Sequence, residues 1–350
     1  MLRAWQSLEI EFPPHRVMHY LVSGLHLETN QPLAMLLAQP GSSRVDVEIG
    51  LGESPPELNQ VLPTQQLWYS SAQVDERGHP SLMIFTLADG AYFRLAFVDG
   101  SEFVVDRNGA KVWGTWSNAV SADERTSYLL GLVLSFVLCL RGVPCLHASA
   151  ISVGNKAIAF IGHEGTGKST IAAAFAMRGC PVIADDLVAL TPLDGTFLAQ
   201  PGYPWLRLRP SAINALSHEN IELPILWPTE DGLYFDLDLT QTGYTFERRA
   251  LPLAALYFCN QPGDDAPGTF IDAMPESPGL MALVANTWAT RVLNPLMRAR
   301  EFETLSQLSA TVPLRRLRTG PNRSSASELT KAILSDFQQI PSTPAMVTVL

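Results

Sequence analysis

The segment that decides the fold is Gly162-His163-Glu164-Gly165-Thr166-Gly167-Lys168-Ser169-Thr170. It matches the phosphate-loop pattern G-x-x-x-x-G-K-S/T at every fixed position. Residues 157–161 before it form an apolar run of strand length, and residues 171–177 after it are rich in alanine and predict a helix. Because this motif needs a strand before it and a helix after it, the segment predicts an α/β domain with a site for phosphate groups.

Each residue type in this loop has a chemical use. Glycines let the backbone turn tightly and aim its N–H groups at an anion, and the following helix adds its positive N-terminal end. Lys168 adds a point charge for the β- and γ-phosphates, and Ser169 is placed to hold Mg²⁺. We therefore expect residues 162–170 to bind ATP, with ATP and Mg²⁺ as cofactors. The alternative, a glycine-rich turn that matches by chance, does not explain the strand and helix around it.

Composition limits the class of protein. The chain has 350 residues, of which 47% are hydrophobic, so we expect about two domains with buried cores. A net charge of −10 argues against nucleic acid or an anionic membrane as a partner. The longest apolar stretch, residues 128–140, is too short to span a bilayer.

The N-terminus and the cysteines bear on location. Glu9 and Glu11 lie where a secretory signal would be apolar. The four cysteines are scattered and contain no C-x-x-C pair, which indicates free thiols in a reducing compartment. We therefore expect a soluble, cytoplasmic protein.

Residues 1–120 predict a mainly β domain. Turn signals at Asp89-Gly90, Asp99-Gly100 and Asn108-Gly109 are spaced about ten residues apart. They separate four runs of strand type, which predict an antiparallel meander over residues 83–87, 92–98, 102–106 and 111–116. The aspartates of this region are better explained as turn residues than as ligands. Since the domain has no cluster of catalytic residue types, we expect it to bind a partner or a peptide.

Residues 121–350 form the expected catalytic domain. Ser121 and Glu124 have the spacing of a capping box and predict a helix that runs to about residue 140. Arg141-Gly142 predicts its end. We place the domain boundary just before this helix.

Two adjacent aspartates supply the acidic half of the site. Residues 181–184 predict a short apolar strand that delivers Asp185 and Asp186 at its C-terminal end, where ligand chemistry gathers in α/β sheets. One carboxylate can orient Mg²⁺ and the other can accept the proton of an attacking hydroxyl. The alternative is a solvated loop pair. Asp185 follows Lys168 by only 17 residues, so one strand–loop–helix–strand unit would supply both halves of the site.

Some basic residues leave alternatives open. His147 lies in a predicted strand over residues 145–153, either as a core histidine or near the phosphates, and spacing alone does not decide. An arginine against the γ-phosphate can raise the rate by about 10³–10⁵, whereas a solvated helix face explains several arginines equally well. The candidates are Arg207, Arg209, Arg248, Arg249, Arg291, Arg298 and Arg300.

The order of these motifs resembles the catalytic core of HPr serine kinase/phosphorylase and its relatives. The shared order is a histidine, the phosphate loop, a short helix ending in Arg-Gly, and Ala-Asp-Asp. Further segments resemble HPr-kinase-like proteins found beside peptide-maturation genes, including the lasso-peptide kinases that phosphorylate a precursor peptide on serine. They are Ser23–Leu25, Pro201–Leu208, Pro252–Tyr257 and Val312–Leu317.

The resemblance implies a compact phosphate-loop kinase fold related to phosphoenolpyruvate carboxykinase, preceded by the β domain. It implies that Lys168 holds the transferring phosphate, that Ser169 and Asp186 hold Mg²⁺, and that Asp185 is the base toward a serine hydroxyl. It also brings His147 near the phosphates as a catalytic residue. Assembly into a homo-oligomer is a further expectation.

The chain departs from HPr kinases proper in ways that bear on the substrate. Thr170 stands where those kinases have glutamate, and their glycine-rich segment for HPr has no counterpart downstream. We therefore expect an ATP- and Mg²⁺-dependent serine kinase that acts on a peptide or small protein, possible examples being ribosomal precursor peptides, rather than on HPr. The alternatives are a nucleotide-gated peptide-binding scaffold with little or no transfer activity and a small-molecule kinase.

Overall fold

The computed structural model of the protein describes residues 17–217, 226–228, 234–240, 243–259, 269–287, 292–319 and 325–341. The N-terminal segment with Glu9 and Glu11, and also Arg291, lie outside the described residues. The chain divides into two compact units. One contains residues up to Leu21 together with Leu25–Ala122, and the other contains Val22–Gly24 together with the chain from Asp123 onward. The architecture is mixed α/β with several sheets, and each unit is described by itself.

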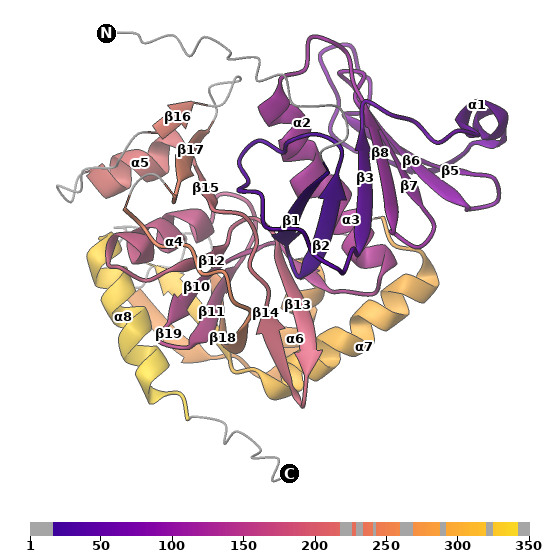
Figure 1. Cartoon of the computed structure of the whole chain (residues 1–350). Coiled ribbons are helices and arrows are strands. Elements are labelled where there is room, and N and C mark those ends of the chain that lie inside the picture. The colour runs from indigo at the N-terminus through magenta and orange to yellow at the C-terminus, as the bar shows by residue number, and fades with distance from the viewer. Residues whose placement is uncertain are drawn as a thin grey trace, which may run out of the picture. The chain divides into compact units, whose positions relative to one another are not determined.

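The first unit is built on a sheet of eight described strands in the order β1-β2-β3-β8-β7-β6-β5-β4 (Figure 1). The strands β5 to β8 are successive antiparallel neighbours, so the predicted meander is present. A short helix, α1 (Leu58–Val61), precedes β4. The strands are β1 (Met18–Val22), β2 (Leu25–Thr29), β3 (Val47–Leu51), β4 (Gln66–Ser70), β5 (Leu82–Leu87), β6 (Tyr92–Phe97), β7 (Glu102–Asp106) and β8 (Lys111–Thr115).

The aspartates of the meander are turn residues, as predicted. Asp89 has a φ of 52°, in the left-handed region that a tight hairpin turn requires. One oxygen of Asp106 accepts the backbone N–H groups of Ala110 (2.6 Å) and Lys111 (2.7 Å). These side chains therefore shape the turns of the sheet.

The second unit begins with the helical segment predicted over residues 121–140. It consists of α2 (Ala122–Tyr128), a π-helical turn (Leu129–Val133) and α3 (Leu134–Leu140). The π-helical turn was not predicted, because apolar residues on every side of the segment do not reveal where its hydrogen-bond pattern changes. The segment ends as predicted: Gly142 has a φ of 74°, and the N–H of Val143 donates to the carbonyl of Leu138 at 2.9 Å.

The central sheet of the second unit contains nine described strands. Its main order is β12-β10-β11-β18-β14-β13-β9, and β20 pairs with both β18 and β19. The strand β11 is parallel to β18 and antiparallel to β10. The strands are β9 (Cys145–Leu146), β10 (Ala148–Val153), β11 (Lys156–Ile161), β12 (Val182–Ala184), β13 (Val188–Leu193), β14 (Thr196–Ala199), β18 (Leu251–Cys259), β19 (Thr269–Ala273) and β20 (Leu314–Thr319).

Helices cover both faces of this sheet (Figure 1). Ile158 and Phe160 of β11 pack in the core with α4 (Lys168–Met177) and α8 (Ala326–Gln339). The alternate residues of β11 pack in the core with α6 (Glu276–Ala285) and α7 (Pro295–Thr311). Because β11 is buried on both faces, its sequence is a continuous apolar run rather than an alternating one.

A smaller sheet completes the described part of the second unit. Its order is β15-β17-β16, and all its pairings are antiparallel. The helix α5 follows β15 directly. The elements are β15 (Trp205–Leu208), α5 (Pro210–Ser217), β16 (Leu226–Pro228) and β17 (Phe235–Asp238).

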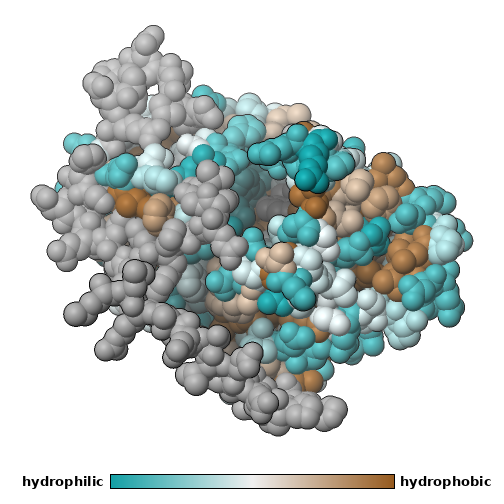
Figure 2. Space-filling model, turned by 90° about the horizontal axis from the view of Figure 1, so that it is seen from above, coloured by the Kyte–Doolittle hydropathy of each residue, from teal (hydrophilic) through white to brown (hydrophobic). Residues whose placement is uncertain are grey.

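The surface and the thiols are of ordinary kinds. In the view of Figure 2, hydrophilic residues cover most of the described surface, and hydrophobic residues appear in small groups. None of the described helices combines the length and the apolarity that crossing a lipid bilayer requires. The four cysteines are free thiols, as predicted, and three of them are buried.

Phe175 anchors the helix that follows the phosphate loop. Its ring stacks on Phe160 of β11 with centroids 5.7 Å apart, and its side chain is fully buried. We expect Phe175→Ala to lower the free energy of unfolding by about 3–5 kcal/mol. The substitution removes the contacts of the ring between α4 and β11 and leaves a cavity in the core. Urea unfolding measures this loss. Phe302→Ala, at a residue that is 49% exposed in α7, is the matched control and should stay within about 0.5 kcal/mol. Equal losses in both variants would contradict the anchoring role.

Candidate active site

Sheet topology brings the predicted site residues to one edge. The strand β10 lies between β11 and β12 and is antiparallel to both. The start of β10 therefore lies beside the ends of β11 and β12. His147 precedes β10, the phosphate loop follows β11, and the pair Asp185-Asp186 follows β12. Residues from before and after the loop thus meet at the edge where α/β sheets bind ligands.

The loop backbone has the shape of an anion cradle. Gly165 and Gly167 have φ values of 80° and 98°, which residues with side chains rarely adopt. A Cβ added at either position would meet no atom within 4 Å, so the space beside the loop is open. At Gly162, a Cβ would lie 2.7 Å from the carbonyl oxygen of Cys259. Conformation at two positions and space at the third therefore require glycine, and the backbone can approach a phosphate closely.

Lys168 is held against the backbone carbonyls of the loop. Its Nζ donates to the carbonyl oxygens of Gly162 (2.8 Å) and His163 (3.1 Å), and the residue is only 7% exposed. Burial lowers the pKa of Lys168, while the charges of Asp186 and Asp185 act in the opposite direction. The ammonium group is therefore positioned on the loop before a phosphate arrives.

Asp185 is the most buried acid of the site, at 4% exposed. Its Oδ1 accepts hydrogen bonds from the hydroxyls of Ser149 (2.5 Å) and Ser169 (2.9 Å). Its Oδ2 accepts the backbone N–H of Arg207 at 3.1 Å. Burial raises the pKa of Asp185, the charge of Asp186 raises it further, and the hydrogen bonds only partly oppose this. The carboxylate is therefore short of positive charge.

The pair Ser169 and Asp185 fits Mg²⁺. A hydroxyl and a carboxylate oxygen are ligands that this ion takes beside a phosphate loop, with phosphate oxygens and water completing its shell. A divalent cation bound here would offset the burial and the charge of Asp186, which raise the pKa of Asp185. No group of three metal-ligating side chains occurs among the described residues, and a site of this type does not need one.

Asp186 faces a different partner from its neighbour. His147 Nε2 lies 3.2 Å from Asp186 Oδ1, and the two side chains are 32% and 52% exposed. Burial acts to raise the pKa of Asp186, but the hydrogen bond from His147 and the charges of His147 and Lys168 lower it overall. Asp186 has a φ of 66°, a left-handed conformation that aspartate tolerates better than most residues. This turn sends two consecutive carboxylates to different sides of the site.

Ser169 contacts Asp185, the first aspartate of the pair: its hydroxyl donates to that carboxylate. That Ser169 and Asp186 hold Mg²⁺, as the resemblance implies, stays a prediction. Sequence analysis missed Ser149, which joins Asp185 from the middle strand. Its only signal was that it is a small polar residue in a buried strand, where Ser152 is the other one.

Among the candidate arginines, Arg207 and Arg209 contact the site. The side chain of Arg207 binds Asp236 on β17, with Nε 2.9 Å from Oδ1, while its backbone reaches Asp185. Arg209 forms an ion pair with Glu164 of the loop. Elsewhere, Arg249 is paired with Glu247 and Arg298 donates to a backbone carbonyl.

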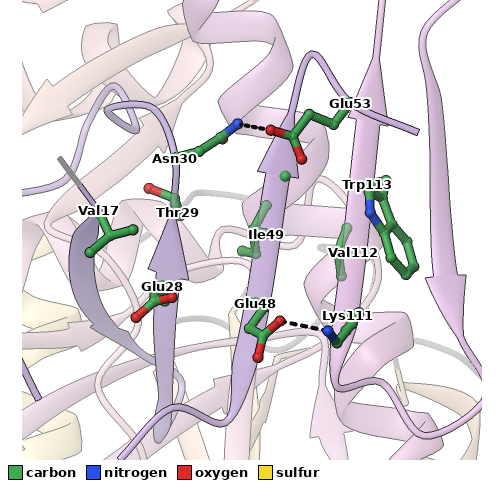
Figure 3. Close-up of a pocket in the computed structure, with 11 residues that line it drawn as sticks. Val17, Glu28, Thr29, Asn30, Glu48, Ile49, Glu53, Lys111, Val112 and Trp113 are labelled. Carbon is green, nitrogen blue, oxygen red and sulfur yellow. Dashed lines mark hydrogen bonds and ion pairs between the residues drawn. The ribbon is translucent and has the colours of Figure 1, made fainter. Parts of the chain in front are cut away.

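The first unit has a pocket of its own, with a volume of about 290 Å³. It lies over β2, β3 and β8, and Glu28, Glu48 and Glu53 line it together with Trp113 (Figure 3). Glu48 is paired with Lys111 at 2.8 Å, and Glu53 accepts a hydrogen bond from Asn30 at 2.8 Å. Three carboxylates and one ammonium group, that of Lys111, line this pocket.

Comparisons with known proteins add little. No family model and no curated protein matches the chain. Among solved structures, the HPr(Ser) kinase/phosphatase from Coxiella burnetii is similar to it at 9% identity and a TM-score of 0.28, over 55% of this chain and 91% of that chain. A likeness of this size establishes neither a shared fold nor a shared activity.

The raised pKa of Asp185 has a consequence for stability. The pKa is higher in the folded protein than the value of about 3.9 for an unfolded aspartate. The stabilisation by this carboxyl is therefore complete below that value and is lost as pH rises through the folded-state pKa. We compare the free energies of unfolding of Asp185→Asn and the natural chain in Mg²⁺-free buffer. We expect the difference to shift in favour of Asp185→Asn as the pH rises from about 4 to about 7.

Urea unfolding at both pH values measures this difference. Asparagine keeps an oxygen for the two serines but turns an NH₂ group toward the N–H of Arg207, which costs stability at every pH. The deciding quantity is therefore how the difference in stability changes with pH. Glu276→Gln, which removes an exposed carboxyl from α6, is the control. A difference between Asp185→Asn and the natural chain that is the same at both pH values would contradict the expectation.

Proposed function

We propose that the protein is an ATP- and Mg²⁺-dependent phosphotransferase that moves the γ-phosphate to the serine hydroxyl of a peptide or small protein. The observation that carries this proposal is the accessible pair Asp186 and His147 beside a phosphate loop that has a second pair, the half-buried Ser169 and the buried Asp185. An ATP site alone needs the loop and the metal ligands. A second, accessible carboxylate is what transfer to a hydroxyl requires in addition.

We propose that Ser169 and Asp185 hold Mg²⁺, which exchanges the two aspartates relative to the roles that the resemblance implied. Asp185 is 4% exposed and both its oxygens already accept hydrogen bonds, so an acceptor hydroxyl has little access to it. When bound, Mg²⁺ neutralises charge on the β- and γ-phosphates. Lys168 provides the second positive charge, from a position that the loop carbonyls maintain.

Asp186 is then the base. A carboxylate is ionised at neutral pH, and the 52% exposed side chain of Asp186 can meet a hydroxyl from outside. The hydroxyl proton moves to the carboxylate, the hydroxyl oxygen bonds to the γ-phosphorus, and the bond from that phosphorus to the β–γ bridging oxygen breaks. His147 orients the carboxylate. Positioning and charge neutralisation provide most of the rate.

The peptide acceptor, the relationship to HPr-kinase and phosphoenolpyruvate carboxykinase folds, and assembly into a homo-oligomer rest on the resemblance in motif order. Thr170 in place of glutamate favours an acceptor other than HPr. A cytoplasmic location agrees with four free thiols and with the supply of ATP.

Transfer is tested with γ-labelled ATP, Mg²⁺ and serine peptides, including any short precursor peptide encoded beside the gene. We expect phosphoserine by mass spectrometry, loss of transfer in Lys168→Met, and a fall in kcat of about 10²–10⁴ in Asp186→Asn with nucleotide binding retained. Asp194→Asn is a matched control, because Asp194 also has a positive φ (45°) but lies in the turn between β13 and β14.

The variants separate the two assignments. A full transfer rate in Asp186→Asn would exclude it as the base. An unchanged Mg²⁺ requirement in Asp185→Asn and Ser169→Ala would exclude the metal assignment. Tight ATP binding with no phosphorylated product in any cognate mixture would favour the nucleotide-gated binding protein.

The pocket of the first unit supports that second candidate. Its three glutamates beside Trp113 suit a peptide with lysine or arginine side chains. We expect Glu48→Gln and Glu53→Gln each to weaken binding of a labelled basic peptide about two- to fivefold, measured by fluorescence polarisation at low salt. Glu76→Gln, at an exposed loop residue, is the control. Equal affinities for all variants would exclude this pocket.

A further inference from the structure

The phosphate loop carries an acid where its ligand is an anion. Glu164 lies inside the loop, two residues after Gly162, and its carboxylate forms an ion pair with Arg209. The hydroxyl of Tyr234 donates to the same oxygen of Glu164 at 2.8 Å. This hydrogen bond, together with Arg209 and the charge of His147, outweighs burial and lowers the pKa of Glu164. The loop therefore has a full negative charge at neutral pH.

Arg209 is fixed at its backbone and accessible at its tip. Its carbonyl accepts the N–H groups of Ala212 (2.9 Å) and Ile213 (3.1 Å), so it opens α5. Its guanidinium lies over the ring of Tyr234, 5.2 Å from the centroid, and donates to the phenol oxygen at 3.0 Å. The side chain is nevertheless 48% exposed. Its tip can therefore change partners without moving the helix.

The strand β15, which precedes Arg209, contacts the aspartate pair of the site. The backbone N–H of Arg207, on β15 and two residues before Arg209, donates to Asp185 at 3.1 Å. Residues 207–209 thus contact both Asp185 and the phosphate loop. The Arg209 guanidinium therefore contacts a residue of the loop whose backbone is shaped to bind an anion.

A carboxylate and a phosphate compete for one guanidinium. Both accept two N–H groups of arginine, and phosphate is the more highly charged of the two. If Arg209 stayed on Glu164, it would only cancel an unfavourable charge. If Arg209 moved to the nucleotide, the ion pair with Glu164 would be its position only while the loop is empty.

We propose that Arg209 is a nucleotide-positioning residue that leaves Glu164 and binds a phosphate oxygen when ATP occupies the loop. This inference rests on the proposed nucleotide site. Glu164 then weakens ATP binding, since it competes for the guanidinium and repels the phosphates. Tyr234 keeps the guanidinium stacked beside the loop in both arrangements.

Equilibrium binding of a fluorescent ATP analogue with Mg²⁺ to the full chain tests the proposal through a double-variant cycle. We expect Arg209→Gln to raise Kd about ten- to a hundredfold and Glu164→Gln to lower it. The deciding comparison is Arg209→Gln in the Glu164→Gln background, where we expect Kd to rise again by at least about tenfold. Arg209→Lys should restore part of the affinity, because it keeps a charge but not the paired donors.

The controls separate this inference from the proposed function. Arg249→Gln breaks an Arg–Glu pair away from the loop, in which the arginine is 66% exposed and Glu247 is 11% exposed, and it should leave Kd unchanged. If Lys168→Met weakens binding but Arg209→Gln has no effect in the Glu164→Gln background, the positioning role is overturned and the nucleotide site stands. If the natural chain does not bind the analogue, the proposed function itself fails.

Discussion

A single carboxylate oxygen joins the three elements of the candidate site. Oδ1 of Asp185 accepts hydrogen bonds from Ser149 on β10 and from Ser169 on α4, while Asp185 itself follows β12. Because the group is buried, removing either donor would leave a charge less well solvated in a low-dielectric surrounding. The shape of the phosphate loop and the position of the acidic pair therefore depend on each other.

Two adjacent aspartates obtain opposite environments from one backbone turn. Asp186 has a left-handed conformation and its side chain contacts His147, whereas the side chain of Asp185 contacts Ser149 and Ser169. Burial raises the pKa of Asp185, whereas the hydrogen bond from His147 and the nearby Lys168 and Arg207 lower the pKa of Asp186. Such a divergence is typical of sites in which two acids have different tasks. The phosphate loop has a charge pair of its own, the ion pair between Glu164 and Arg209.

Much of the fold could be predicted because its signals are local. Hairpin turns such as Asp89-Gly90 mark the meander at residues close in sequence, and the cap Arg141-Gly142 marks the end of α3. The π-helical turn at Leu129–Val133 could not be predicted, since it depends on how the segment packs. The order of the nine-stranded sheet was equally out of reach, because strand pairing joins residues far apart in sequence.

The sequence by itself determined the chemistry at the phosphate loop: glycines at Gly162, Gly165 and Gly167, a lysine, a serine, and two aspartates 17 residues after that lysine. Only the tertiary structure decided the partners. It placed β10 between β11 and β12, which brought Ser149 and His147 to the site, and it joined Ser169 to Asp185. It also joined Glu164 to Arg209, 45 residues away. The physical reason is that residue type and spacing specify local backbone geometry, whereas hydrogen bonds between distant segments exist only once the strands have paired.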